Sequence, residues 1–360
     1  MKKLKLSENP KILIVRNDGL GDFILTLPLI SALKNNFRKS KIYVLVNKNI
    51  ENLVPVLSDI DGCIIDEGIL LKRHRNLFNK SEQERKKKEL LEIIKKHNFN
   101  LAVLPYAEKE SAKIIYQAKI PFRAGTGRRV FSWRFNVKLW QGRKKSNLPE
   151  YKLNMAYLKK INIKENYAAP KIKLISDKKI KANKKTIIMH PYKRNSTALS
   201  WPVESFKNLA EILIKSGYKI TIIGDKEDEI FLKKQFKPGK NLSIHTSLSL
   251  QGLSYLISQS RLFIGNSSGP LHLSALVKIA HIGFFPQNKA SSRVRWQTLP
   301  LSKKDDYQKF LLSSAFDKNC VNCEREKCRY FNCTASISVE DALAACRHQK
   351  ISFKNSKKQS

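Results

Sequence analysis

The fold of this 360-residue chain can be predicted from one segment near its beginning, Lys11-Ile-Leu-Ile-Val-Arg-Asn-Asp-Gly-Leu-Gly-Asp22. The apolar run from Lys11 to Val15 predicts a short buried strand, and the polar residues and glycines behind it predict a tight turn. A segment with helical spacing follows from Phe23 to Lys34, although Pro28 is awkward inside a regular helix. Because Lys41 to Val46 is a second apolar run, the order is strand, turn, helix and strand. This βαβ unit implies a parallel sheet.

The same alternation continues along the chain and restarts once. After a Lys-rich segment, Asn162 to Lys185, a new strand is predicted at Thr186 to Met189, and strands and helices alternate again to about Phe285. We therefore predict an α/β protein with two doubly wound domains facing one cleft, in which ligands bind at the carboxyl ends of the strands. The predicted parts are a first domain at 1–165, a linker at 166–185, a second domain at 186–350 and a basic tail at 351–360.

The composition is strongly basic, with 69 Lys and Arg against 30 Asp and Glu and a net charge of +39. Residues 101–200 alone carry 24 Lys and Arg against 5 acids. Such charge indicates nucleic acid, an anionic membrane surface or a phosphorylated substrate nearby, or it reflects a lysine-rich genome. With 42% hydrophobic residues the chain is not disordered throughout. No run approaches the roughly 20 apolar residues that span a membrane.

The first glycine turn, Gly19-Leu-Gly-Asp22, is a candidate ligand site. Gly19 and Gly21 permit close backbone approach, and free N–H groups at a helix start attract anions. The turn lacks the third glycine of the dinucleotide-binding fingerprint. Asp22 is either the helix N-cap or a carboxylate that projects into the cleft as a general base.

The second glycine turn, Gly265-Asn-Ser-Ser-Gly-Pro-Leu-His272, follows a predicted strand in the second half. Ser267, Ser268 and the N–H groups behind them could hold phosphate oxygens, or a serine caps the helix above a core His272. Lys193 and Arg194 are either ligands of an anion or exposed loop charges. The acidic run from Gly224 to Glu229 either accepts hydrogen bonds from ribose hydroxyls or complements a helix dipole.

Two further clusters carry possible chemistry. Cys320, Cys323, Cys328 and Cys333 are spaced either for a structural zinc ion or as ordinary reduced thiols. The stretch 123–145 interleaves cations with aromatic rings, so it could stack on single-stranded nucleic acid or lie on an anionic membrane interface. Its members are Arg123, Arg128, Arg129, Arg134, Lys138, Arg143, Lys144 and Lys145, with Phe131, Trp133, Phe135 and Trp140.

Taken together, these motifs resemble those of glycosyltransferase family 9, the ADP-heptose:lipopolysaccharide heptosyltransferases. Ile12-Leu-Ile-Val-Arg16 followed by Leu20-Gly-Asp22 and Leu27-Pro28 is similar to the family's N-terminal signature. The turn Gly265 to Ala275 is similar to its Asp-Thr-Gly-Pro-x-His-x-Ala turn, and Trp201-Pro202 with Phe206 to its Trp-Pro-x-x-x-Phe helix start. The cysteine cluster also resembles one found in many members.

The resemblance implies a GT-B fold of two Rossmann-like domains and an inverting transfer that needs no metal or other cofactor. Asp22 falls on the family's catalytic base. The positions that the resemblance assigns to the nucleotide-sugar are Ser267, Ser268, Gly269 and His272 on the phosphate turn, Lys193 or Arg194 as the cation, and Asp228, or its neighbour Glu227, as the acidic contact.

The resemblance also implies an acceptor and a location. ADP-heptose or a related nucleotide-sugar is the expected donor, and an anionic, Kdo-bearing lipid A the expected acceptor. The enzyme is then expected in the cytoplasm, peripheral at the inner face of the inner membrane, with Arg123, Arg128, Arg129 and Arg134 docking the acceptor or membrane and no nucleic-acid partner.

Several departures from the family pattern leave alternatives open. Ser267-Ser268 stands where the family has Asp-Thr, so a carboxylate contact is missing. Another nucleotide-sugar or acceptor, or an inactive member, is therefore an alternative. A basic nucleotide- or RNA-binding protein without transferase activity is the alternative from another class.

Overall fold

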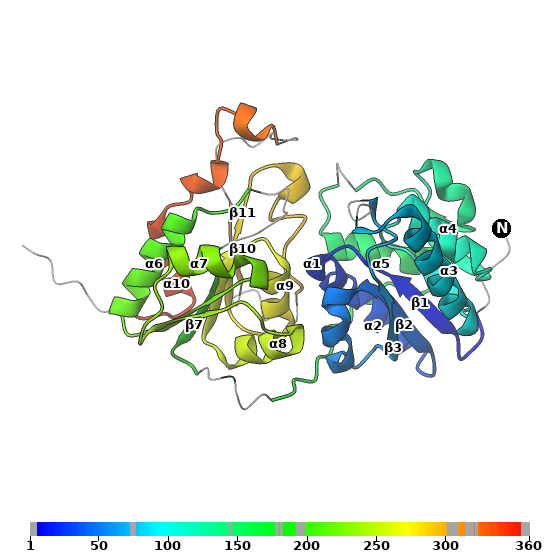
Figure 1. The fold of residues 1–360 in the computed structure, drawn as a ribbon, viewed down its shortest axis with the longest axis horizontal. Helices are drawn as coiled ribbons and strands as arrows, with labels where there is room; N and C mark the ends of the chain where they lie inside the picture. The colour runs from blue at the N-terminus through cyan, green and yellow to red at the C-terminus, as the bar shows by residue number, and fades with distance from the viewer. Residues whose placement is uncertain are drawn as a thin grey trace, which may run out of the picture. The chain divides into compact units, whose positions relative to one another are not determined.

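The computed structural model describes residues 6–72, 77–143, 146–176, 180, 183–191, 199–300, 309–313, 320 and 323–353. The chain divides into two compact units, Met1–Lys173 and Leu174–Ser360, each built around its own parallel sheet (Figure 1). The predicted α/β architecture of two doubly wound sheets is confirmed.

The sheet of the first unit has six parallel strands in the order β3-β2-β1-β4-β5-β6. This is the strand order of dinucleotide-binding folds. The order of the strands reverses between β1 and β4, and ligands of such folds bind at the carboxyl ends of these two strands. Register is regular, with Ile14 beside Val44 of β2 and Val103 of β4. The strands are β1 (Lys11–Val15), β2 (Lys41–Asn47), β3 (Gly62–Asp66), β4 (Leu101–Val103), β5 (Phe122–Thr126) and β6 (Val137–Leu139).

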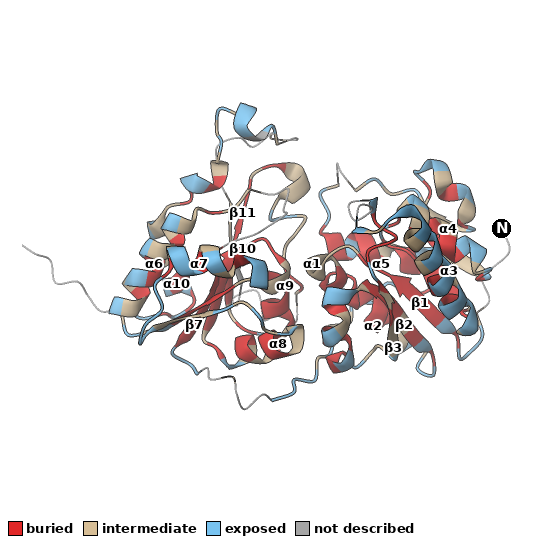
Figure 2. Ribbon diagram, viewed as in Figure 1, coloured by how far each residue is buried: buried red, intermediate tan, exposed pale blue. Residues whose placement is uncertain are grey.

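Helices cover the sheet of the first unit and bury its central strands (Figure 2). Helix α3 is the most charged of them, and it buries only Leu90 and Ile94 while its other face remains polar. The helices are α1 (Leu20–Ile24), α2 (Leu27–Asn36), α3 (Lys80–Lys96), α4 (Lys109–Gln117) and α5 (Glu150–Lys160), with short 3-10 helices η1 (Lys48–Val56) and η3 (Val130–Arg134).

The single helix predicted from Phe23 to Lys34 is wrong in one respect. The structure has two helices there, α1 ending at Ile24 and α2 beginning at Leu27. Pro28 lies in the first turn of α2, where its missing N–H costs nothing and its fixed φ suits a helix start. The break is held by the Thr26 hydroxyl, which donates to the Asp22 carbonyl at 2.9 Å. The proline is therefore a start signal rather than a kink.

The second unit repeats the same strand order, β9-β8-β7-β10-β11-β12. Its crevice accordingly falls between β7 and β10. The strands are β7 (Thr186–His190), β8 (Lys219–Ile223), β9 (Leu242–His245), β10 (Leu262–Asn266), β11 (His281–Phe285) and β12 (Lys309–Ser313). The helices are α6 (Val203–Lys215), α7 (Glu229–Gln235), α8 (Leu250–Gln259), α9 (Gly269–Leu276) and α10 (Val339–His348), with 3-10 helices η4 (Lys226–Asp228), η5 (Lys289–Ser291), η7 (Arg325–Lys327) and η8 (Cys333–Ser336).

Trp201 is the centre of the second core. Its indole is fully buried, stacks on Phe284 with ring centroids 4.1 Å apart, and meets Phe206 edge-on at 4.8 Å. The indole N–H donates to the carbonyl of Ile337 at 2.7 Å, so its one polar group is satisfied. This packing gives the Trp-Pro-x-x-x-Phe pattern a structural role.

Sequence periodicity did not predict β5 and β6, which lie inside the basic and aromatic stretch. Phe122-Arg-Ala-Gly-Thr126 is neither an apolar run nor a clean alternation, and its pairing with β4 comes from tertiary contacts. In the part of the chain that the structure describes, no helix is long and apolar enough to cross a membrane.

Candidate active site

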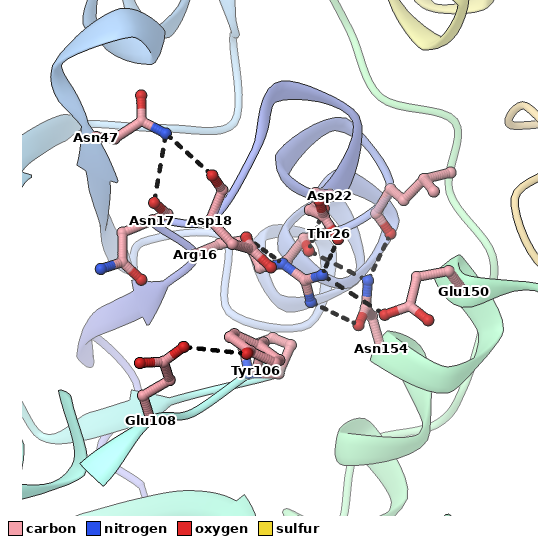
Figure 3. Close-up of polar contacts among 12 residues, drawn as sticks. Arg16, Asn17, Asp18, Asp22, Thr26, Asn47, Tyr106, Glu108, Glu150 and Asn154 are labelled. Atoms are coloured by element: carbon pink, nitrogen blue, oxygen red, sulfur yellow. Dashed lines mark hydrogen bonds and ion pairs between the residues drawn. The ribbon is translucent and has the colours of Figure 1, made fainter. Parts of the chain in front are cut away.

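Arg16 is the centre of a polar cluster at the carboxyl end of β1 (Figure 3). Its guanidinium is buried and donates to Asp18 Oδ1 at 2.9 Å, Asp22 Oδ1 at 2.7 Å and Asn154 Oδ1 at 3.2 Å. The carboxylate of Glu150 lies 3.5 Å from the same Nη2 that binds Asp22. Burial alone would lower the pKa of Arg16, but the attraction of the three carboxylates outweighs it, so the pKa is raised. A permanent cation therefore organises this crevice.

Asp22 lies in the first turn of α1, and its carboxylate retains 26% exposure. The N-cap of α1 is Gly19, with an extended backbone, so the prediction that Asp22 caps this helix is wrong. A Cβ atom at Gly19 would lie 3.0 Å from Asp22 Oδ2, which is tighter than ordinary packing allows. Glycine at this position therefore leaves room for the carboxylate above the turn.

The pKa of Asp22 is raised to about 7 from a usual value near 3.8. Burial is the largest cause, and the charges of Asp18 and Glu150 add to it, while Arg16 opposes the rise. A carboxylate with such a pKa is half ionised near neutral pH. It can therefore accept a proton there, which an ordinary surface aspartate does poorly.

A second layer of side chains, from α5 and from the segment before it, surrounds Arg16. Asn154 is fully buried, and its amide donates to the Leu25 carbonyl at 3.0 Å and to Thr26 Oγ1 at 3.2 Å. Arg143 donates to Asn154 Oδ1 at 3.0 Å and to the Pro105 carbonyl at 2.7 Å, and it forms an ion pair with Glu150.

None of Arg16, Glu150 and Asn154 is among the predicted site residues. A signal for one of them was present, because Glu150 is the only acid between Glu110 and Glu165. A single carboxylate kept in so basic a stretch indicates a specific cationic partner, and Arg16 with Arg143 supplies it.

The turn that carries Asp18 is fixed from its other side. The Asn47 amide lies 3.3 Å from the Asn17 carbonyl and 3.5 Å from that of Asp18, and the Asn17 amide donates to Asp66. Tyr106, which follows β4, lies with its ring 6.0 Å from the guanidinium of Arg16 (Figure 3). Residues at or just after the carboxyl ends of β1, β2, β3 and β4 thus converge on one edge of the sheet.

The second unit presents a turn of serines between β10 and α9. Ser268 is the N-cap of α9, but its hydroxyl does not cap the helix and instead lies 3.0 Å from His190 Nδ1 at the end of β7. Asn266 ties the two strands together by accepting from the Trp201 N–H at 2.7 Å and donating to the Pro191 carbonyl at 3.0 Å. The predicted Ser267 and His272 are buried beside them. The start of α9 therefore brings hydroxyl and N–H groups together.

Asp228 lies behind β8, in the same unit, at the end of the short 3-10 helix η4. It is buried, and its Oδ2 accepts from the Asp225 N–H at 3.1 Å. Its Oδ1 is buried and accepts no hydrogen bond from any residue that the structure describes. Such an oxygen suits a hydroxyl donor from a ligand.

The remaining predicted residues fall in different places. Lys193 and Arg194 lie outside the described residues. Cys320, Cys323, Cys328 and Cys333 are each partly exposed, and the described parts of the chain contain no group of three or more His, Cys, Asp or Glu side chains arranged for a metal ion. Arg123 is turned inward, donating to the carbonyls of Arg134 at 2.8 Å and Ile120 at 2.5 Å, whereas Arg128 and Arg129 are exposed.

This chain is similar in sequence and in fold to known glycosyltransferases. The family model described as glycosyltransferase family 9 (heptosyltransferase) matches residues 88–330. A putative glycosyltransferase of Haemophilus influenzae is 25% identical over 356 residues, with 93% of this chain and 95% of that protein covered. Lipooligosaccharide heptosyltransferase 2 of Haemophilus ducreyi is 24% identical over 294 residues, covering 74% and 79%. The solved E. coli heptosyltransferase WaaC with ADP shares the fold, with a TM-score of 0.73, 13% identity and coverage of 94% and 99%.

Proposed function

The chain belongs to glycosyltransferase family 9, and we propose that it transfers a heptose-type sugar from ADP-heptose to a lipopolysaccharide inner-core acceptor. The observation that carries the proposal is the Asp22 carboxylate, partly exposed at the carboxyl edge of the first sheet and held by a buried arginine. The names of the Haemophilus ducreyi relative and of the ADP-bound E. coli neighbour support heptose as the sugar and ADP as its carrier.

Asp22 is the general base of the proposed reaction. Arg16 occupies its Oδ1, and Oδ2 accepts no hydrogen bond within the described chain, so Oδ2 is the oxygen that takes the proton of the acceptor hydroxyl. As that proton leaves, the acceptor oxygen forms a bond to the anomeric carbon and the bond from that carbon to the diphosphate breaks. A single displacement of this kind inverts the anomeric configuration. Its base must be ionised at working pH, and a pKa near 7 meets that need.

The second unit binds the donor in this proposal. Hydroxyl and N–H groups of Ser267, Ser268 and Gly269, with His272 behind them, receive the diphosphate at the start of α9. Asp228 accepts a hydrogen bond from a ribose hydroxyl through its buried Oδ1. Lys193 or Arg194 supplies the cation. Fixed donors and one cation stabilise the charge that develops on the leaving diphosphate, so the reaction needs no metal.

The acceptor is an anionic, phosphorylated and Kdo-bearing lipid A, and the enzyme works at the inner face of the inner membrane. The exposed Arg128 and Arg129, in a chain of net charge +39, support this acceptor, because anionic lipids attract basic segments.

The test is Asp22→Asn, which keeps the size of the side chain and its hydrogen bond to Arg16 but removes the base. We expect kcat to fall by about 10²–10⁴-fold, while ADP still raises the thermal stability of the variant as it does that of the wild type. Glu165→Gln, an exposed acid of the same unit, is the matched control and should retain full activity. Turnover of Asp22→Asn within a few-fold of the wild type would overturn the role of Asp22.

A second donor is favoured by one observation. Ser267 and Ser268 stand where the resemblance expects Asp and Thr, so the turn lacks a carboxylate that could read a sugar hydroxyl. A panel of nucleotide-sugars compared by thermal shift separates the two, since the true donor stabilises the protein at the lowest concentration.

A further inference from the structure

The short 3-10 helix η3, Val130–Arg134, carries an unusual group of exposed apolar side chains. Val130 is 99% exposed, Trp133 58%, and Trp140, which follows β6, 64%. Single exposed hydrophobic residues are ordinary on protein surfaces. A cluster of them ringed by cations instead marks an interaction site.

The η3 turn is firmly anchored. Phe131 packs towards the core and meets the buried Phe135 at 6.5 Å. The buried Ser132 hydroxyl accepts from the Arg129 N–H at 3.0 Å and donates to the Thr126 carbonyl at 2.6 Å. Since side chains three residues apart eclipse in a 3-10 helix, Val130 and Trp133 lie on the same outer face. The anchored turn therefore holds Val130 and Trp133 exposed to solvent.

Two more aromatic rings extend this surface. Tyr116 of α4, itself exposed, meets Trp133 edge-on at 5.1 Å. The Trp140 indole lies flat on Gly127, where a Cβ atom would come within 2.6 Å of the ring. Glycine thus lets the ring lie against the backbone, with its other face towards solvent.

The stretch of sequence that carries these rings is charged with one sign. Arg134 lies over Trp133 with 4.5 Å from its guanidinium carbon to the ring centroid, and Arg128 and Arg129 are exposed beside Val130 in sequence. Residues 111–149 contain ten Lys and Arg and no acid. Arg123 is not part of this exposed surface, because its guanidinium donates hydrogen bonds to backbone carbonyls.

We propose that the η3 turn inserts Val130 and Trp133 into the interface of an anionic lipid bilayer, with Arg128, Arg129 and Arg134 at the headgroup phosphates. Aromatic rings and arginine suit the headgroup level, and an aliphatic tip suits the acyl boundary below it. A fully exposed valine gains nothing from stacking on a base, so the surface fits a bilayer better than RNA. The inference rests on the proposed function only for the origin of the bilayer, and it assigns the membrane contact to apolar residues as well as to arginines.

The experiment measures binding of the full chain to vesicles of phosphatidylethanolamine and phosphatidylglycerol, against vesicles of phosphatidylcholine alone. We expect Val130→Asp with Trp133→Ser to lower the partition coefficient by about ten-fold or more, and Arg128→Gln with Arg129→Gln by about five-fold per charge. Tryptophan quenching by brominated lipid should fall in Trp133→Phe. Ile230→Ser removes an equally exposed apolar side chain from α7, which is 85% exposed in the other unit, and should bind vesicles as the wild type does.

Each result is decisive. The inference is overturned if Val130→Asp with Trp133→Ser binds anionic vesicles as well as the wild type, or if single-stranded RNA competes the vesicles away and binds more tightly than they do. Turnover on a water-soluble acceptor fragment is measured in parallel and should be unchanged in Val130→Asp with Trp133→Ser, in Trp133→Phe and in Ile230→Ser. Vesicle binding that needs Val130 and Trp133, without any transfer from ADP-heptose, would support the insertion and refute the proposed function alone.

Discussion

Replacing Glu150 by glutamine should move the pH profile of the enzyme without changing Asp22, the proposed base. Glu150 is buried on α5, and it shares Arg16 Nη2 with Asp22, at 3.5 Å against 2.7 Å. Its charge is one of the causes that raise the pKa of Asp22. The amide of glutamine keeps the shape and a hydrogen-bond acceptor, so the substitution removes the charge of Glu150 and, with it, the ion pair with Arg143.

The size of the shift follows from the geometry. Two oxygens bound to the same nitrogen at these distances are at most about 6 Å apart. At an effective dielectric constant of about 20, their repulsion is about 3 kcal/mol, or about two pKa units. Solvent reaches the 26% exposed carboxylate of Asp22 and screens part of this. We therefore expect the pKa of Asp22 to fall by about 0.5–1 unit.

The assay is release of the nucleoside diphosphate, with kcat/KM followed across pH. Because Asp22 must be ionised to accept a proton, activity rises with pH through its pKa, and the acidic limb should lie near pH 7 in the wild type. In Glu150→Gln this limb should move to lower pH. Glu165→Gln removes one exposed acid and serves as the control. An unmoved limb, or one displaced to higher pH, would refute the electrostatic coupling of Glu150 to Asp22.

Three further predictions follow from the same contacts. Since the pKa of Asp22 is raised from 3.8 to about 7, the folded state binds the extra proton and wild-type stability falls as pH rises through that range. Asp22→Asn should therefore have a free energy of unfolding about 2 kcal/mol above that of the wild type at pH 8, after allowance for exposure, and the gain, measured by denaturant titration, should vanish near pH 4. Gly19→Ala should displace the carboxylate and lower kcat about ten-fold with the donor KM unchanged; an unchanged kcat would show that the turn has slack. Ser268→Ala, which loses the contact with His190, should raise the donor KM and cost about 1 kcal/mol of stability in denaturant titration; an effect on kcat alone would contradict a donor-binding role.

The sequence was sufficient to predict the fold class because its signals are local. An apolar strand such as Lys11–Val15, buried on both faces, predicts a parallel sheet. The glycine turn that follows it predicts the βαβ crossover. Four short strands, β5, β6, β9 and β12, escaped prediction. Of these, β5 and β6 have no clear apolar pattern, and they become strands by pairing with β4 and each other. Tertiary pairing overrides propensity at such positions.

Some residues of the candidate site could be predicted from short motifs, and others could not. Asp22 could be singled out because it belongs to a short motif, and Ser268 because it belongs to another. Arg16 was expected only as the first residue of a polar turn, and Glu150 and Asn154 belonged to none of the motifs singled out. Their importance comes from their contacts with Arg16, which lies 134 residues from Glu150 and 138 residues from Asn154 in the sequence. No spacing rule reaches across such a distance, although the isolation of Glu150 among basic residues was a usable hint.

The contacts that tune Asp22 all come from the first unit, whereas the serine turn, His190 and Asp228 all belong to the second. This separation has an evolutionary consequence. In the proposed function, a substitution in the serine turn, such as the serine at 267, changes the donor site and leaves the contacts of Asp22 unchanged. In the same proposal, a substitution on the acceptor side of the first unit leaves the contacts of the serine turn unchanged, so each half can change its specificity separately.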